Sequence, residues 1–366
     1  MSILIFIIIL AILILVHEFG HFIVAKKSGI RVDEFGLGFP PKIFAKKWGS
    51  TTYTLNAIPF GGFVKIFGED SHDEDISDAD KKTSFLYKPK WIQASVLVAG
   101  VTFNIIFAWL CISLGFMIGM PSSAGYSSFG KTVNTSLVIT EVLSNSPAQK
   151  AGLISGDKIV FASAGDNALQ DENLTPEKIS SLISESSAQT IEVIYSRGET
   201  APKTAFVEPT SGVIAGKRAI GIATDSIGTL KLPVYLAPLE GARTTWLLTK
   251  GTVVGLSQFL WKIVIFKSDF SQVAGPIGIA KVVGEANNLG FVYLLSLIAL
   301  ISINLAVINL LPFPALDGGR LLFVGIEAVI RRPIKPSVVR WTNAVGFILL
   351  IILMVVVTGH DILNLL

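Results

Sequence analysis

Three stretches of this chain are long and apolar enough to cross a lipid bilayer, and a fourth is only slightly shorter. They cover residues 3–25, 92–117, 291–311 and 341–357. About 20 apolar residues form a helix that spans the hydrocarbon core of a membrane. Charged residues make up 16% of the chain, whereas a typical soluble protein carries about 25%. The sequence therefore predicts a polytopic α-helical membrane protein with about four transmembrane helices.

The distribution of Lys and Arg predicts the orientation of these helices. Basic residues are dense in the loop between the first two stretches and in the short loop between the last two, and sparser in the long middle segment. By the positive-inside rule both loops are cytoplasmic, and the middle segment and both termini lie outside the cytoplasm. The acidic stretch 69–75 is expected to be a solvated cytoplasmic loop.

Residues 245–266 could form a further transmembrane helix, because they are apolar. However, they contain Lys250 and Lys262. A charge at mid-membrane depth costs about 3 kcal/mol. We therefore expect an amphipathic helix that lies on the membrane surface. If this segment crossed the membrane, Asp317 would lie on the opposite side from His17, so the metal site described below requires that it does not cross.

The middle of the chain is predicted to be soluble and mixed in structure. Segments rich in β-branched residues predict strands, and a Gly-Asp pair at 156–157 predicts a turn. The expected strands are 137–142 and 190–195, and the expected short helices are 146–151 and 176–183. The chain thus divides into a first membrane half (1–120), an extracytoplasmic domain (121–228) and a second membrane half (229–366). A net charge of +3 is too small to indicate nucleic-acid binding.

The first apolar stretch carries the sequence H-E-F-G-H at residues 17–21. Residues four apart share one face of a helix, so His17 and His21 can bind one metal ion. Glu18 is rotated about a quarter turn away, from where it can reach a water molecule beside the metal and act as a general base and then acid. A structural polar cluster is the alternative, but a charged Glu18 in an apolar helix would then be costly without a function.

A catalytic zinc site needs a third protein ligand and an open position. The single cysteine, Cys111, cannot supply a Cys-rich site and is given no function, while His72 lies in the acidic loop and His360 beyond the last span. Asp317 is the better candidate, because Pro312 and Pro314 break the third helix just before it. The alternative, that Asp317 caps a helix beginning near Gly318, is equally supported by spacing and compatible with metal binding.

The two motifs together resemble those of the site-2 protease family of intramembrane zinc metalloproteases, in its bacterial form. H-E-F-G-H on the first transmembrane helix is followed, after the third, by N-x-x-P-x-x-x-L-D-G at 309–318. Residues 31–40 resemble the family's segment after the first helix, residues 55–69 its membrane-dipping β-hairpin, and Gly100 to Asn104 its G-x-x-x-N motif. The resemblance covers nearly the whole chain.

This resemblance implies roles for individual residues. His17, His21 and Asp317 would bind Zn²⁺, and Glu18 would be the catalytic acid and base. Asn309 would help to hold an extended substrate near the zinc. The hairpin edge would receive the unwound substrate by strand addition; its residues are Gly61, Gly62, Phe63 and Val64. Residues 275–278 resemble the family's segment before the third helix, and we assign them no chemistry.

The middle segment resembles a single PDZ domain, so the expected fold is a helical membrane protein with a membrane-associated β-hairpin and an inserted α+β PDZ domain. Residues 146–159 match S-P-A-x-x-A-G-L-x-x-G-D-x-I, and residues 218–222 suggest the permuted strand order of bacterial examples. The domain would either bind peptide C-termini or screen bulky substrates from the membrane entrance. We favour screening, because no clear carboxylate-binding loop precedes Leu137.

The expected activity is hydrolysis of peptide bonds within single-span membrane proteins, such as anti-sigma factors already cut by an upstream site-1-type protease, or remnant signal peptides. This is regulated intramembrane proteolysis at the bacterial inner (cytoplasmic) membrane, with the catalytic site toward the cytoplasmic side. A PDZ-bearing membrane scaffold with a non-catalytic metal site is the first alternative, although such a site would not need Glu18. A zinc transporter is the second, although no internal repeat is visible.

Overall fold

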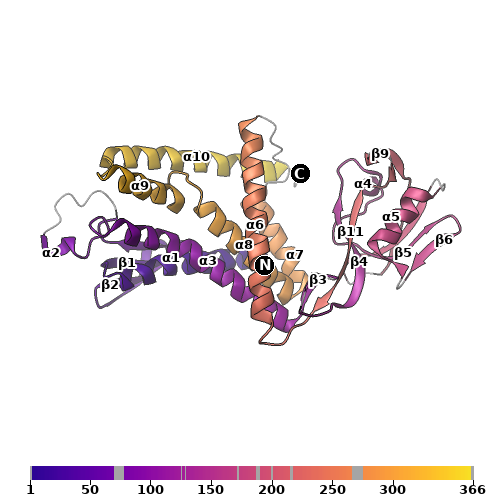
Figure 1. Ribbon diagram of the computed structural model, residues 1–366, viewed down its shortest axis with the longest axis horizontal. Coiled ribbons are helices and arrows are strands. Elements are labelled where there is room, and N and C mark those ends of the chain that lie inside the picture. The colour runs from indigo at the N-terminus through magenta and orange to yellow at the C-terminus, as the bar shows by residue number, and fades with distance from the viewer. Residues whose placement is uncertain are drawn as a thin grey trace. The chain divides into compact units, whose positions relative to one another are not determined.

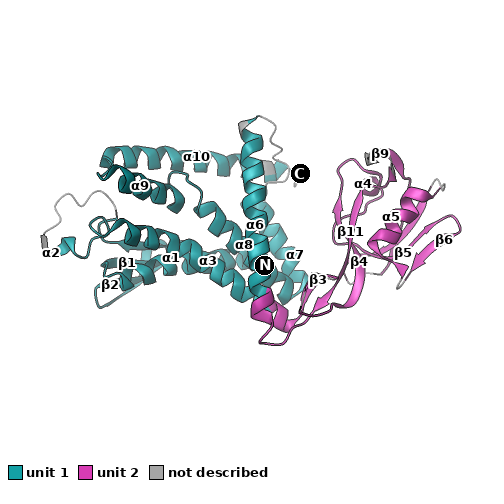
Figure 2. Ribbon diagram, in the orientation of Figure 1, with its two compact units in different colours: residues 1–114, 241–366 teal, residues 115–240 magenta. Residues whose placement is uncertain are grey.

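The long apolar helices and the mixed α/β segment form different parts of the structure. The computed structural model describes residues 2–69, 78–124, 126–127, 129–170, 173–186, 190–198, 201–214, 217–265 and 275–363. The chain forms two units: one comprises Met1–Leu114 and Gly241–Leu366, and the other comprises Gly115–Glu240 (Figure 2). The second unit is thus an insertion into the first and contains the segment 121–228.

Four helices in the described part of the chain are long and apolar enough to cross a membrane (Figure 1). They confirm the four predicted stretches: α1 (Ser2–Lys27), α3 (Lys90–Ile118), α8 (Phe291–Asn309) and α10 (Pro336–Leu363). Helix α10 extends beyond the predicted 341–357 at both ends. The first unit also contains α2 (Asp78–Lys81), α7 (Pro276–Leu289), α9 (Asp317–Ile330) and most of α6 (Ala237–Val264).

Helix α6 contains residues 245–264 of the segment 245–266, and Phe266 lies outside the described residues. It is not among the four candidate spans. The helical form agrees with the expected amphipathic helix, and its place on the membrane surface stays a prediction.

One face of α1 packs against the protein, and the opposite face is apolar and exposed. The buried residues recur every three or four positions: Ile9, Leu13, His17, Gly20, His21 and Ala25. A Cβ atom at Gly20 would lie 2.5 Å from the carbonyl oxygen of Ala99 in α3. Glycine at this position therefore lets the two helices approach closely, as small residues do between membrane helices.

A long antiparallel hairpin, β1 (Val32–Trp48) and β2 (Thr51–Ile66), follows α1. Its register is unusual, because residues 34–37 of β1 pair with two parts of β2, namely 52–55 and 62–65. Within the described residues, 62–65 are paired on that side only. They form a sheet edge whose other side presents unpaired backbone groups, to which another strand can add.

The second unit is built on a seven-stranded sheet in the order β3-β11-β4-β5-β7-β8, with β6 paired to β5. The strands are β3 (Met120–Ser123), β4 (Val133–Val142), β5 (Lys158–Ala164), β6 (Asn167–Gln170), β7 (Ile191–Ser196), β8 (Lys203–Val207) and β11 (Ile222–Leu230). A separate pair comprises β9 (Thr210–Ile214) and β10 (Lys217–Ala219), and the helices are α4 (Pro147–Lys150) and α5 (Pro176–Glu185). The predicted strands and short helices in this segment are confirmed.

Asp157 fixes the predicted Gly-Asp turn of this unit. Its carboxylate is fully buried and accepts a hydrogen bond from the Ile154 amide at 2.9 Å. The Arg197 guanidinium donates two more hydrogen bonds to this carboxylate, from Nε at 2.7 Å and from Nη2 at 2.8 Å. Arg197 Nη2 also donates a hydrogen bond to the Gly152 carbonyl oxygen. The turn and the start of β5 thus depend on one ion pair, in which the carboxylate is buried and the guanidinium is partly exposed.

Replacing Asp157 with Ala is expected to lower the free energy of unfolding by about 2 kcal/mol, because it leaves the Ile154 amide and the guanidinium without their acceptor. Chemical denaturation of the protein, followed by amide hydrogen exchange of residues 115–240, measures the change. Asp166→Ala, at an exposed turn, is the control and should shift the transition little. Equal effects of both substitutions would contradict the structural role given to Asp157.

Candidate metal centre

The two histidines of H-E-x-x-H lie near the end of α1, on its buried face. His17 is 6% exposed and His21 7%. The helical spacing places their Nε2 atoms 3.2 Å apart. The two ring nitrogens therefore point to a common centre, as the i, i+4 spacing predicts.

Asp317 is brought to the same place by the break after α8. Helix α8 ends at Asn309, and Ala315 adopts a left-handed φ of +71° before α9 begins at Asp317. Gly318 is required here, because a Cβ atom would collide with the carbonyl oxygens of Leu310 and Leu311. The prolines, the left-handed residue and the glycine together turn the chain sharply enough to aim the carboxylate at α1.

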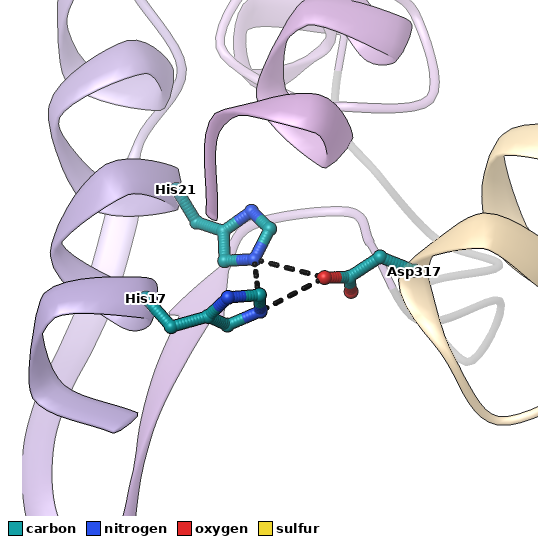
Figure 3. A group of neighbouring side chains, drawn as sticks. All are labelled: His17, His21 and Asp317. Carbon is teal, nitrogen blue, oxygen red and sulfur yellow. Dashed lines mark hydrogen bonds and ion pairs between the residues drawn. The ribbon is translucent and has the colours of Figure 1, made fainter. Parts of the chain in front are cut away.

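The Asp317 carboxylate contacts both histidines (Figure 3). Its Oδ2 atom lies 2.9 Å from His17 Nε2 and 3.3 Å from His21 Nε2. The N-cap of α9 is Leu316, and the helix has no side-chain cap hydrogen bond. The structure thus directs this carboxylate at the histidines, and not at the helix end as the capping alternative expects.

The three ligand atoms fit a zinc ion. Zinc binds nitrogen and oxygen at about 2.0–2.1 Å, so neighbouring ligands of a tetrahedral site lie about 3.3 Å apart. The observed edges of the triangle are 2.9, 3.2 and 3.3 Å. A cavity of 230 Å³ adjoins the triangle and is lined by His17, Glu18, Asn309 and Asp317, among others. It provides the space for a fourth, exchangeable position that a catalytic site requires.

The Nδ1 atoms of both imidazole rings contact groups of α3. These contacts were not predicted from the sequence. His21 Nδ1 lies 2.8 Å from the Val96 carbonyl oxygen, to which it donates. His17 Nδ1 lies 3.2 Å from the side-chain nitrogen of Asn104, and Asn104 Oδ1 is buried with no hydrogen-bond partner among the described residues. Amide nitrogen and oxygen are assigned by their contacts. Turning this amide by 180° lets His17 Nδ1–H donate to Oδ1, and both Nε2 lone pairs then face the metal position.

Gly100 provides the space for this arrangement. A Cβ atom there would collide with His21 Nε2 and lie 2.8 Å from His17 Nε2. Both residues of the G-x-x-x-N pattern at 100–104 therefore shape the site: Gly100 leaves room for the imidazoles, and Asn104 orients that of His17. The pattern was visible in the sequence, but only the packing of α3 against α1 reveals this use.

Gly100→Ala is expected to lower zinc affinity more than ten-fold, because the added methyl displaces one or both imidazoles from the ligand triangle. Competition with a chromophoric chelator measures the affinity. Gly255→Ala is a matched control, since Gly255 is a helical glycine of α6 with open space around it. If both variants bind zinc like the unchanged protein, Gly100 does not shape the site.

Glu18 and Asn309 lie beside the triangle and line the same cavity. The Asn309 side-chain nitrogen is 3.5 Å from His17 Nε2. Of the predicted hairpin residues, Gly62 lies close to Glu18: a Cβ atom at Gly62 would be 3.6 Å from Glu18 Cγ. Gly61, Phe63 and Val64 flank it in β2. The structure thus brings the edge strand next to Glu18. His72 and the side chain of His360 lie outside the described residues.

Comparison with known proteins agrees with this chemistry. A family model described as Peptidase family M50 matches residues 5–353. A Clostridium perfringens protein named "Putative zinc metalloprotease CPE1693" is 35% identical over 352 residues, which cover 96% of this chain and 95% of the relative. A similarly named protein of Synechocystis is 35% identical, over 98% of this chain and 93% of its own length. Another, of Mesorhizobium japonicum, is 31% identical, over 97% of this chain and 97% of its own length.

Proposed function

Since this chain belongs to peptidase family M50, the site-2 protease family of membrane-embedded zinc metalloproteases, we propose that it hydrolyses peptide bonds inside membranes. His17, His21 and Asp317 would hold the zinc. The observation that carries this proposal is the triangle of His17, His21 and Asp317 ligand atoms, built on one candidate span and on the chain break that follows another.

The residues around the triangle supply the rest of the chemistry. Zinc bound there would supply Lewis-acid polarisation of the scissile carbonyl and the attacking water. Glu18, across the same cavity, accepts the proton of that water and delivers it to the leaving amine. The Asn309 amide donates a hydrogen bond to the substrate backbone. Val96 and Asn104 keep both histidines in the tautomer that leaves Nε2 free.

The substrate must be extended at the site, because a helix hides its carbonyl groups in hydrogen bonds. The edge formed by residues 62–65 can pair with an unwound segment through its backbone. Its closeness to Glu18 supports this role. Gly61, Gly62, Phe63 and Val64 would then bind the backbone of the substrate, and the hairpin would enter the membrane to do so.

The inserted unit would be an extracytoplasmic PDZ domain. Ser146 caps α4 with a hydrogen bond to the Gln149 amide, in the S-P-A-x-x-A-G-L motif. The last strand, β11, pairs with β4, which supports the permuted order. We propose that this domain screens bulky proteins from the membrane entrance. The charge asymmetry of the loops supports a bacterial inner-membrane location with the metal site toward the cytoplasm.

The substrates proposed are single-span proteins shortened on the outer face, of the anti-sigma-factor type, and remnant signal peptides. An upstream site-1-type protease would make the first cut, and the lipid bilayer is the other partner.

The test is cleavage of a single-span substrate by the purified protein in phosphatidylcholine vesicles, with the products identified by mass spectrometry. A cut within the apolar segment, lost with a zinc chelator and restored by zinc, supports the proposal. A cut only in the soluble flanks would overturn it.

A further inference from the structure

A second cavity, of 540 Å³, opens in the first unit. Apart from Glu69, its lining residues come from the start of α3 and the loop before it, and from α9, α10 and the loop between them. Phe85 and Leu97 form part of one side, and Val324 and Val339 form part of the other. The cleft therefore has an apolar floor.

Helix α9 lines both this cleft and the catalytic cavity. Asp317, Arg320, Val324 and Glu327 are spaced by three, four and three residues, so they lie on one face of α9. The first of them lines the catalytic cavity, and the other three line the cleft. Ten residues of helix rise about 15 Å, a length that four or five residues of extended peptide cover at about 3.3 Å each.

The acidic groups that line the cleft are in ion pairs, whereas two of its basic groups are not paired with any residue the structure describes. Glu69 is paired with Arg320 at 2.6 Å, and Glu327 with Lys90 at 2.5 Å. Both acidic groups of the lining therefore have a cation. Lys335 and Arg340, at the exposed rim, have no ion pair with any residue the structure describes. The cleft thus presents an excess of positive charge above an apolar floor.

We propose that this cleft binds the part of the substrate that leads from the scissile bond toward the cytoplasm, and that it prefers acidic residues alternating with apolar ones there. This inference rests on the proposed function. The ligand is a peptide because one face of α9 lines both the catalytic cavity and the cleft, and the length of that face matches a short extended segment. Lys335 and Arg340 provide the charge preference, and the apolar floor receives the alternate side chains.

The experiment compares three substrates with the same apolar span and with acidic, neutral or basic cytoplasmic flanks, in phosphatidylcholine vesicles. The unchanged protein should cleave the acidic-flank substrate with a kcat/KM about five-fold above the neutral one, as two partly exposed ion pairs allow. The double variant Lys335→Gln, Arg340→Gln should lose this preference and cleave the neutral substrate normally. The charge-reversing double variant Lys335→Glu, Arg340→Glu should prefer the basic flank.

Arg331→Asn with Arg332→Gln is the matched control, since it removes two charges from the loop that also carries Lys335 but from positions outside the cleft lining; it should keep the preference. Equal rates on all three flanks with the unchanged protein would overturn the proposal. The same variants are also assayed in vesicles that contain phosphatidylglycerol. A loss of activity in the Lys335 and Arg340 variants that is the same for all flanks and occurs only in those vesicles would indicate a lipid ligand and would likewise overturn the proposal. Failure to cleave even the neutral substrate would instead refute the proposed function itself.

Discussion

Glu18→Gln is expected to reduce the cleavage rate by roughly a thousand-fold while zinc remains bound. The amide has the shape of the carboxylate but cannot accept a proton from water at neutral pH, and general acid–base catalysis contributes about 10²–10⁴-fold. Glu18 lines the catalytic cavity and is not one of the three ligand atoms that converge. Loss of activity should therefore be separable from loss of metal. Single-turnover cleavage and zinc analysis of the same sample measure the two.

Glu285→Gln is the control for this substitution, because Glu285 is exposed on α7. It should leave both activity and zinc content unchanged. Cleavage by the Glu18→Gln protein at the normal rate would refute the role of Glu18, and loss of zinc would mean that Glu18 is itself a ligand.

Asp317→Asn is expected to remove most of the bound zinc and, with it, the activity. The change keeps the size of the side chain but replaces an anionic ligand by a neutral amide, which zinc binds far less well. Zinc content after dialysis against a weak chelator measures the loss, and thermal unfolding followed by circular dichroism checks that the protein remains folded.

A second substitution separates metal binding from helix capping. Serine is among the best capping residues but a poor zinc ligand, so Asp317→Ser should be as defective in zinc binding as Asp317→Asn. If Asp317→Ser instead restored full zinc content and activity, Asp317 would serve the start of α9 rather than the metal.

The helices and the paired histidines could be predicted because they depend on local pattern. Twenty apolar residues must form a helix in a bilayer, and the spacing of His17 and His21 fixes their common face. Asp317 was harder. Its distance of 300 residues from His17 meant that spacing alone left ligand and helix cap equally supported, and the contact to the histidines is visible only once α8 and α9 are folded onto α1.

The parts that sequence did not reveal depend on contacts between distant segments. The G-x-x-x-N pattern of Gly100 and Asn104 was visible in the sequence, but its use appears only when α3 packs on α1, where the glycine makes room for the imidazoles and the asparagine orients His17. The double pairing of residues 34–37 leaves 62–65 as an edge, and such a register cannot be derived from alternation within one strand. Helix α7 was likewise not predicted, because its apolar and polar residues are mixed.

The central claim is that His17, His21 and Asp317 hold a catalytic zinc ion, and X-ray absorption at the zinc edge tests it most directly. For the purified protein, the spectrum should show two imidazole nitrogens and oxygen ligands at about 2.0–2.1 Å, without sulfur. His21→Ala should abolish or halve the imidazole signal. A zinc signal without paired imidazoles, or one that His21→Ala leaves unchanged, would contradict the account.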